Sequence, residues 1–66
     1  MKYELIDHIV GEKAQSNNFT ELEEEAERRL VIHNSHFYYK HRGVHEPANA
    51  CIYFEENKII IDYKRD

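Results

Sequence analysis

Histidine is concentrated in one short stretch of this sequence. Residues 33–45 read HNSHFYYKHRGVH and contain four of the five histidines, and the fifth is His8. Imidazole nitrogens are common zinc ligands and common general acids and bases, so the stretch could belong to a metal site or to an acid–base site. A third interpretation is that the histidines are polar positions of ordinary secondary structure. The elements around them decide between the three.

A structural zinc site requires about four ligands that converge on one ion. By number, enough ligand atoms are present, on His33, His36, His41, His45 and Cys51. If residues 35–42 form a strand, however, its side chains alternate between two faces, so His36 and His41 point in opposite directions. His33 then ends the preceding helix and His45 lies in the following loop. We therefore expect neither a metal site nor a cofactor, and a histidine metal site is the lesser alternative.

No other pattern in the sequence predicts catalysis. Asp62 falls opposite Cys51 in the hairpin register described below, and a neighbouring carboxylate disfavours the thiolate that a nucleophile requires. The two glycines, Gly11 and Gly43, form no phosphate-binding loop, and there is no HExxH motif. We therefore expect a protein that is not an enzyme.

The chain has the length of one small domain, residues 1–66. Such a domain buries only about 60% of its unfolded surface, so its stability is marginal unless a disulfide, a metal or a partner subunit adds to it. Cys51 is the only cysteine, which excludes an internal disulfide and is typical of a reducing cytoplasm. No signal peptide and no apolar span of about 20 residues are visible, so we expect a cytoplasmic protein without membrane association.

Charge is unevenly distributed along the chain. The net charge is −4, with eight acidic against two basic residues in positions 1–27 and seven basic against five acidic residues in positions 28–66. An acidic protein is poorly suited to nonspecific phosphate binding as its main activity. The mildly basic second half leaves nucleic-acid binding open for one face only.

Residues 2–10 have an apolar pattern close to that of a helix. Their aliphatic side chains recur at helical spacing: Leu5, Ile6, Ile9 and Val10. Gly11 follows where a helix C-terminal glycine is common, so the pattern predicts a short helix. A strand is the alternative, because Ile and Val are β-branched. Residues 11–19 have the composition of a polar connection.

Residues 20–34 have the start signal and the charge pattern of a helix. Thr20 and Glu23 have the spacing of a capping box. Acidic residues fill the first turns and Arg28 and Arg29 follow them, which suits the helix dipole. The apolar stripe is narrow and consists of Leu22, Ala26, Leu30 and His33. Most of this helix therefore faces water, and its run of glutamates is a solvated face.

Three strands are predicted in the second half, over residues 35–42, 49–55 and 58–64. The last two flank Glu56 and Asn57, a two-residue hairpin loop in which Asn57 can adopt a positive φ. The register has the pairs Glu55–Lys58, Phe54–Ile59, Tyr53–Ile60, Ile52–Ile61 and Cys51–Asp62. One face of the hairpin then collects the apolar side chains of Ala50, Ile52, Phe54, Ile59, Ile61 and Tyr63.

These elements predict an α+β fold with one or two helices on one face of a three-stranded antiparallel meander. The expected order is α-α-β-β-β, with β-α-β-β-β as the alternative if residues 2–10 form a strand. The other face of the meander is open and mixes aromatic, basic and apolar side chains. The candidate binding residues on this face are Tyr38, Lys40, Arg42, Tyr53 and Ile60.

Two functions fit such a surface. Tyrosine and arginine are enriched in protein interfaces, and exposed Tyr53 and Ile60 on a marginal domain favour a protein partner or a second copy. We therefore expect a self-associating protein-interaction or regulatory module, most simply a homodimer. The alternative is a single-stranded nucleic-acid-binding module, in which tyrosines stack on bases and Lys40 and Arg42 neutralise phosphates. In size, acidity and lack of catalytic motifs, the chain resembles small accessory proteins of bacteria and their phages.

Overall fold

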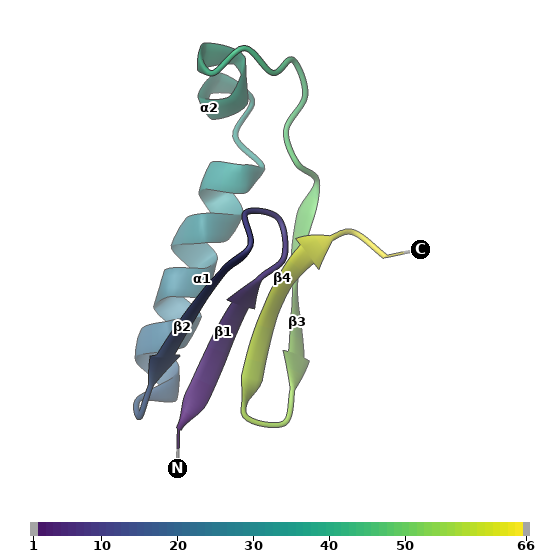
Figure 1. The fold of residues 1–66 in the computed structure, drawn as a ribbon. Coiled ribbons are helices and arrows are strands. Elements are labelled where there is room, and N and C mark those ends of the chain that lie inside the picture. The colour runs from purple at the N-terminus through teal and green to yellow at the C-terminus, as the bar shows by residue number, and fades with distance from the viewer. Residues whose placement is uncertain (1, 66) are drawn as a thin grey trace.

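Residues 2–65, which the computed structural model describes, fold into a four-stranded sheet, a long helix on one face of it and a short helix at one end (Figure 1). In chain order, the elements are β1 (Tyr3–Asp7), β2 (Glu12–Ser16), α1 (Phe19–His33), α2 (His36–His41), β3 (Ala50–Glu55) and β4 (Lys58–Tyr63). The α+β class predicted from the sequence is confirmed.

The sheet consists of two hairpins joined side by side, in the strand order β2-β1-β4-β3. β1 pairs antiparallel with β2, and β3 pairs antiparallel with β4. The two hairpins meet at a parallel pairing of β1 with β4, which places Leu5 beside Ile59 and Ile6 beside Ile60. The predicted three-stranded antiparallel meander is therefore wrong, because a strand from the N-terminal segment lies at the centre of a mixed sheet.

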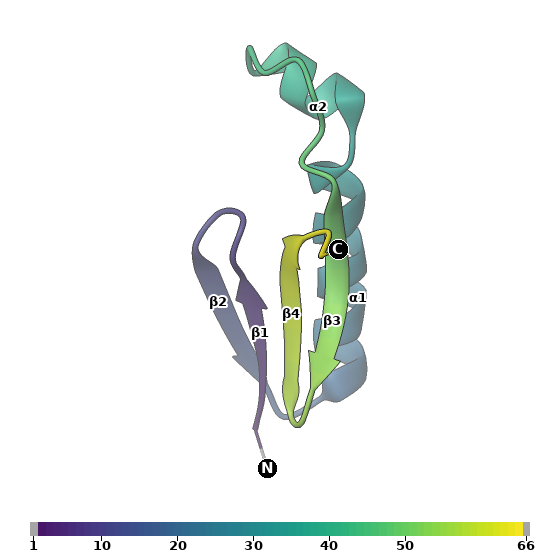
Figure 2. The same ribbon diagram turned by 90° about the vertical axis from the view of Figure 1, so that its right-hand side faces the viewer.

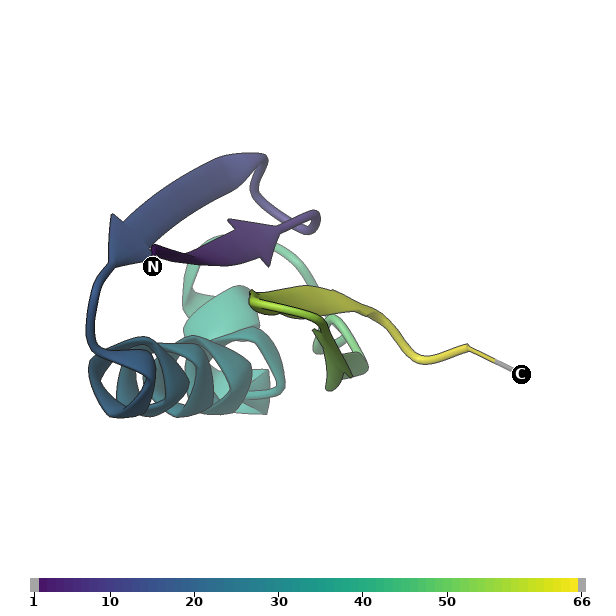
Figure 3. The same ribbon diagram turned by 90° about the horizontal axis from the view of Figure 1, so that it is seen from below.

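One face of the sheet packs against α1, and we call it the inner face. Figures 2 and 3 show α1 lying along this face, while the other, outer face carries no helix within residues 2–65. The buried core lies between α1 and the central strands and consists of Leu5, Leu22, Ala26, Ala50, Ile59 and Ile61. Of the predicted helix stripe, Leu22, Ala26 and His33 are buried and Leu30 packs at the margin of the core.

The N-terminal segment is a hairpin, so the helix predicted over residues 2–10 is wrong and its strand alternative is right for Tyr3–Asp7. Leu5 and Ile6 are both apolar because β1 is a central strand, with Leu5 on the inner face and Ile6 on the outer face. Gly11 has φ 72° in the β1–β2 turn rather than at a helix end. The polar connection predicted over residues 11–19 contains the edge strand β2.

The segment 35–42 contains the short helix α2 (His36–His41) with its two caps, so the predicted strand is wrong there. Ser35 caps this helix, because its hydroxyl accepts a hydrogen bond from the backbone N–H of Tyr38 at 3.2 Å. The aromatic residues that favoured a strand have no neighbouring strand to pair with at this point. β-propensity describes fit to a pleated, half-buried surface, and no such surface is available next to the end of α1.

Two other predictions are confirmed with small adjustments. Residues 20–34 coincide with α1, but its N-cap is Asn18, whose side chain accepts from the N–H of Glu21 at 3.3 Å, and not Thr20. The β3–β4 hairpin has the predicted register throughout. Asn57 has φ 61° in its loop, as expected for a two-residue turn that requires positive φ.

Candidate functional site

Asp7 and His33 form a buried polar pair where β1 and α1 end. Asp7 is 1% exposed and His33 is 5% exposed. Each lies at the last position of its element, on the side that faces the core. His33 Nε2 lies 2.9 Å from Asp7 Oδ2, and Arg29 Nη1 donates to the same oxygen at 3.0 Å. Charged groups are seldom buried unless they are paired, and these contacts supply the partners of the carboxylate.

The second oxygen of Asp7 holds the β1–β2 turn. Asp7 Oδ1 accepts hydrogen bonds from the backbone N–H groups of Ile9 at 3.0 Å and Val10 at 3.4 Å. Arg29 extends the contacts to β2, because its Nη2 donates to Glu12 Oε2 at 2.9 Å. The carboxylate of Asp7 therefore fixes the position of the turn relative to α1.

His33 connects Asp7 to α2 through Tyr39. Its Nδ1 lies 2.9 Å from the hydroxyl of Tyr39, and the two rings stack with centroids 6.5 Å apart. A carboxylate can only accept, so His33 Nε2 carries the proton that points to Asp7. In the neutral ring, Nδ1 then accepts from the Tyr39 hydroxyl. We call Arg29, Asp7, His33 and Tyr39 the buried network.

The buried network perturbs two pKa values. Burial by itself raises the pKa of Asp7, but the hydrogen bonds from His33 and Arg29 outweigh it, so the pKa lies below its usual value. Burial raises the pKa of the Tyr39 phenol, and the neighbouring Tyr38 acts in the same direction. Asp7 is therefore a carboxylate, and Tyr39 keeps its proton, at neutral pH.

The geometry of the buried network is that of a structural support. A general base needs a ring nitrogen within reach of a substrate. In His33, however, Nε2 faces Asp7 and Nδ1 faces Tyr39. Cys51 belongs to β3, where its register position places it on the outer face of the sheet. Within residues 2–65, every buried side-chain nitrogen or oxygen has a hydrogen-bond partner.

A groove of about 610 Å³ lies over Tyr39, next to the buried network. It runs between the β1–β2 turn, α2, the loop before β3 and the end of β4. Its walls are mainly apolar and consist of Ile9, Val10, Tyr39, Val44, Glu46, Pro47, Ala48, Asn49 and Tyr63. Three of these side chains remain about half exposed: Val10 at 49%, Val44 at 49% and Tyr63 at 55%. Ligand sites are typically concave and apolar with a few polar groups, as this groove is.

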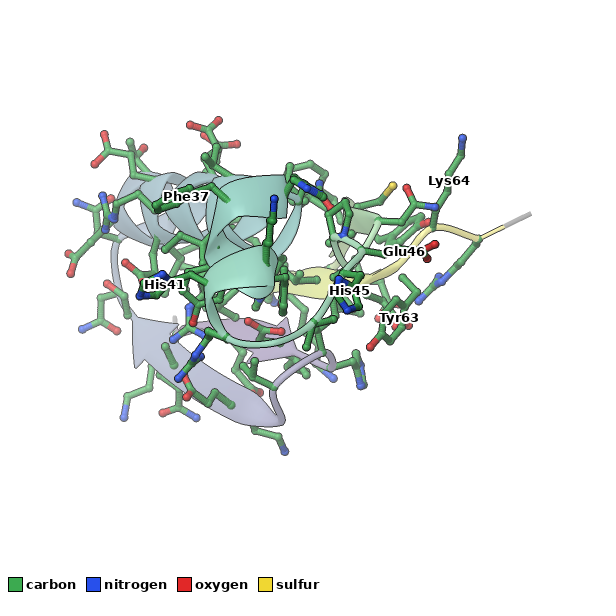
Figure 4. The ribbon with its side chains drawn as sticks, turned by 90° about the horizontal axis from the view of Figure 1, so that it is seen from above. Phe37, His41, His45, Glu46, Tyr63 and Lys64 are labelled. Atoms are coloured by element: carbon green, nitrogen blue, oxygen red, sulfur yellow. The ribbon has the colours of Figure 1, made fainter. Side chains whose placement is uncertain are left out.

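Further exposed apolar side chains lie outside the groove at the same end of the molecule. Ile32, Val31 and Phe37 are 42%, 70% and 77% exposed, at the end of α1 and the start of α2. In Figure 4, which looks down on this end, Phe37 and His41 lie on one side, and His45, Glu46, Tyr63 and Lys64 lie on the other. We call this region, with α2, the β1–β2 turn and the loop before β3, the α2 end.

The structure divides the predicted binding residues between two surfaces. Tyr38 and Lys40 lie on α2, and Arg42 is its C-cap, with the Arg42 guanidinium 5.1 Å from the centre of the Tyr38 ring. Tyr53 and Ile60 are cross-strand neighbours on the outer face of the sheet. Because residues 35–42 are helical, the aromatic and basic residues predicted for one sheet face do not lie together on it.

Ile60 is 6% exposed, so the prediction that it is exposed is wrong. It lies in a central strand, and its neighbours on the outer face are Ile6 of β1 and Tyr53 of β3. Tyr53 is itself covered in part, because the guanidinium of Arg65 lies 4.2 Å from the centre of its ring. The outer face is therefore better packed than its lack of a covering helix suggests.

The histidines are dispersed, and only His33 is buried. His8, His36, His41 and His45 are exposed. Within residues 2–65, no three His, Cys, Asp or Glu side chains are placed to hold a metal ion together. In the same part of the chain, no helix has both the length and the apolar character required to cross a membrane.

Sequence reasoning missed Asp7, Arg29 and Tyr39. One signal for Asp7 was present, since it continues the inward alternation of Tyr3 and Leu5, but it is readable only once residues 3–7 are known to be a strand. Tyr39 falls in the segment 35–42, and the strand predicted there gave no reason to place it next to His33. The chain matches no protein-family model, and no curated protein or solved structure is significantly similar to it.

Proposed function

We propose that this chain is a non-catalytic protein-interaction module that binds an apolar peptide segment of its partner in the groove at the α2 end. The observation that carries the proposal is that Val10, Val44 and Tyr63, each about half exposed, line one groove. Exposed apolar side chains that occur singly are ordinary, whereas apolar side chains gathered in one concave region are characteristic of binding sites.

The buried network supports this proposal by giving the groove a fixed shape. Tyr39 lies in the groove wall and is bonded to His33, and the turn that carries Val10 is bonded to Asp7. Two walls that come from distant parts of the sequence, the β1–β2 turn and α2, are therefore connected through Asp7 and His33. A preformed groove binds more tightly than a flexible one, because less conformational entropy is lost when the ligand binds.

Nucleic-acid binding through α2 is the second candidate. It is favoured by the stacking of Arg42 on Tyr38 next to Lys40, a combination that can contact both a base and a phosphate. The net charge of −4 and the separation of Tyr53 from α2 weigh against it. Protein binding is therefore the preferred function.

A displayed library of short random peptides, selected against the immobilised chain, tests the proposal. The selected peptides should share apolar residues and bind the wild type. Val44→Asp places a charge in the groove wall and should weaken their binding at least about tenfold, or about 1.4 kcal/mol. Val31→Asp is the matched control, because Val31 is 70% exposed and lies outside the groove lining.

Peptides that bind the wild type and Val44→Asp equally would overturn the proposed site, as would a selection that yields no apolar consensus. Circular dichroism checks that both variants fold. Labelled single-stranded oligonucleotides distinguish the second candidate. Binding that weakens with salt and is lost in Lys40→Ala and Arg42→Ala would favour nucleic acid as the ligand.

A further inference from the structure

β3 is an edge strand whose free side is partly unpaired. It pairs with β4 on one side, and no strand lies on its other side within residues 2–65 (Figure 2). The N–H of Lys64 donates to the carbonyl of Asn49 at 2.9 Å, which sets the phase of the β3–β4 ladder. In an antiparallel ladder, alternate residues direct their main-chain groups to the partner strand. Ala50, Ile52 and Phe54 therefore direct theirs to the free edge.

Asn34 occupies the first of these three positions. Its Nδ2 donates to the carbonyl of Ala50 at 2.9 Å, and its Oδ1 accepts from the N–H of Ala50. The side-chain amide thus takes the place of a neighbouring strand at one residue. Ile52 and Phe54 have no such partner among residues 2–65, and the Phe54 side chain is 59% exposed.

We infer that two copies of this chain associate by antiparallel pairing of their β3 strands, with Ile52 of each copy opposite Phe54 of the other. The two-fold axis passes beside Tyr53, and the two sheets become one continuous sheet. This surface is distinct from the groove, so the inference goes beyond the proposed function and does not depend on it. Strand addition to an exposed edge is a common mode of protein association.

The free main-chain groups select this register among the two-fold arrangements. Pairing about Tyr53 lets each Ile52–Phe54 pair exchange two hydrogen bonds. Pairing about Ile52 would place Phe54 opposite Ala50, whose groups Asn34 already holds. Pairing about Phe54 would place Ile52 opposite Glu56, which lies beyond the end of β3. Only the register about Tyr53 uses every free group of the edge.

The side chains agree with this register. Ile52 and Phe54 of both copies form one apolar row on the inner face, which covers the exposed ring of Phe54. Phe54 already packs on Phe19 of α1, with ring centroids 6.3 Å apart, so the row continues from the core of each copy. On the outer face, Glu55 lies opposite Cys51 of the second copy, and no like charges are directly opposed.

The other edge of the sheet is protected against the same association. β2 has the sequence EKAQS, with Glu12, Lys13 and Gln15 exposed. Charged side chains on a short edge strand are a usual means of preventing edge-to-edge pairing. The association therefore stops at a dimer rather than continuing into a fibre.

Disulfide cross-linking tests the register directly. Tyr53→Cys in a Cys51→Ser background puts the two thiols beside the axis, where the Cα atoms of a non-hydrogen-bonded pair are about 4.5 Å apart, within disulfide range. Mild oxidation should give a covalent dimer. Glu55→Cys in the same background is the matched control and should not cross-link, because its Cα atoms would be about 13 Å apart. Glu55→Cys with native Cys51 should cross-link again.

Sedimentation of the reduced protein, from low micromolar to submillimolar concentration, tests the association itself. The wild type should be a dimer. Phe54→Ala should still dimerise, because it keeps the main-chain donor, but more weakly, because it lacks the ring that the second copy covers. Phe54→Pro removes the donor that faces the edge and should be monomeric, with the fold checked by circular dichroism. A wild type that is monomeric throughout would overturn the inference. A dimer that fails to cross-link at position 53, or that Phe54→Pro leaves intact, would overturn it as well.

Discussion

At the scale of single residues, the carboxylate of Asp7 connects parts of the chain that are far apart in sequence. It accepts hydrogen bonds from the β1–β2 turn and from Arg29 and His33 of α1. His33 then reaches Tyr39 of α2. The structure of the groove at the α2 end thus depends on one group, the Asp7 carboxylate, that is itself buried.

Asp7→Asn should be strongly destabilising, because it replaces a buried carboxylate oxygen that accepts from both Arg29 and His33. Hydrogen bonds to a buried charged group are each worth about 1.5–3 kcal/mol, so the loss should be about 2 kcal/mol or more. Glu12→Gln removes the exposed partner of the same arginine and should cost about 0.5 kcal/mol or less. Urea unfolding followed by circular dichroism measures both. An equal loss in the two variants would contradict the structural role given to Asp7.

The same variant should change how stability depends on pH. The pKa of Asp7 is lowered in the folded protein, so its contribution is complete above the unfolded value of about 3.9 and is lost as the pH falls through the folded value. The wild type should therefore lose stability more steeply than Asp7→Asn below about pH 4. Other carboxylates, such as Glu25, are present in both proteins and cancel in the comparison. Parallel curves for the two proteins would show that Asp7 contributes nothing in this range.

At the scale of elements, local signals were sufficient for the β3–β4 hairpin but not for the β1–β2 hairpin. The β3–β4 hairpin has the predicted register because its two-residue loop fixes the pairing of the flanking residues. β2 was missed because an edge strand needs few apolar residues. Its inner-face positions are Glu12, Ala14 and Ser16, and of these only Ala14 is apolar. The central place of β1 depends on its pairing with β4, about fifty residues away, which no local pattern encodes.

The start of α1 gives a prediction at this scale. Asn18, and not Thr20, caps the helix, so Asn18→Ala should lower the free energy of unfolding by about 1 kcal/mol. Thr20 is exposed within the first turn, so Thr20→Ala should change the free energy of unfolding by about 0.5 kcal/mol or less. Urea midpoints of the two variants at neutral pH decide the matter. A larger loss of stability in Thr20→Ala than in Asn18→Ala would instead indicate the capping box that the sequence predicts.

At the scale of the whole molecule, the core and the candidate groove occupy different parts of an elongated domain of 40 × 24 × 17 Å. The core lies between α1 and the central strands, and the groove lies beyond it at the α2 end. Figure 1 shows α2 beyond the end of the sheet. None of the six residues of α2, all within the described part of the chain, is fully buried, and Tyr39 of the buried network is half-buried. The sequence predicted most of the core residues, but it could not predict a groove built from four segments that only the tertiary fold brings together.

This arrangement predicts that the α2 end opens without unfolding of the sheet. In native-state hydrogen exchange, the amides of Ile59 and Ile61 should exchange only through global unfolding, because both side chains are fully buried in a central strand. The amide of Val44, bonded to the carbonyl of Tyr39 at 2.8 Å, should exchange far faster, at a rate almost independent of added urea.

A bound groove peptide should slow exchange at Val44, because it binds the closed form of the α2 end. Equal protection and equal urea dependence at Val44 and Ile61 would instead mean that the groove and the core unfold as one unit.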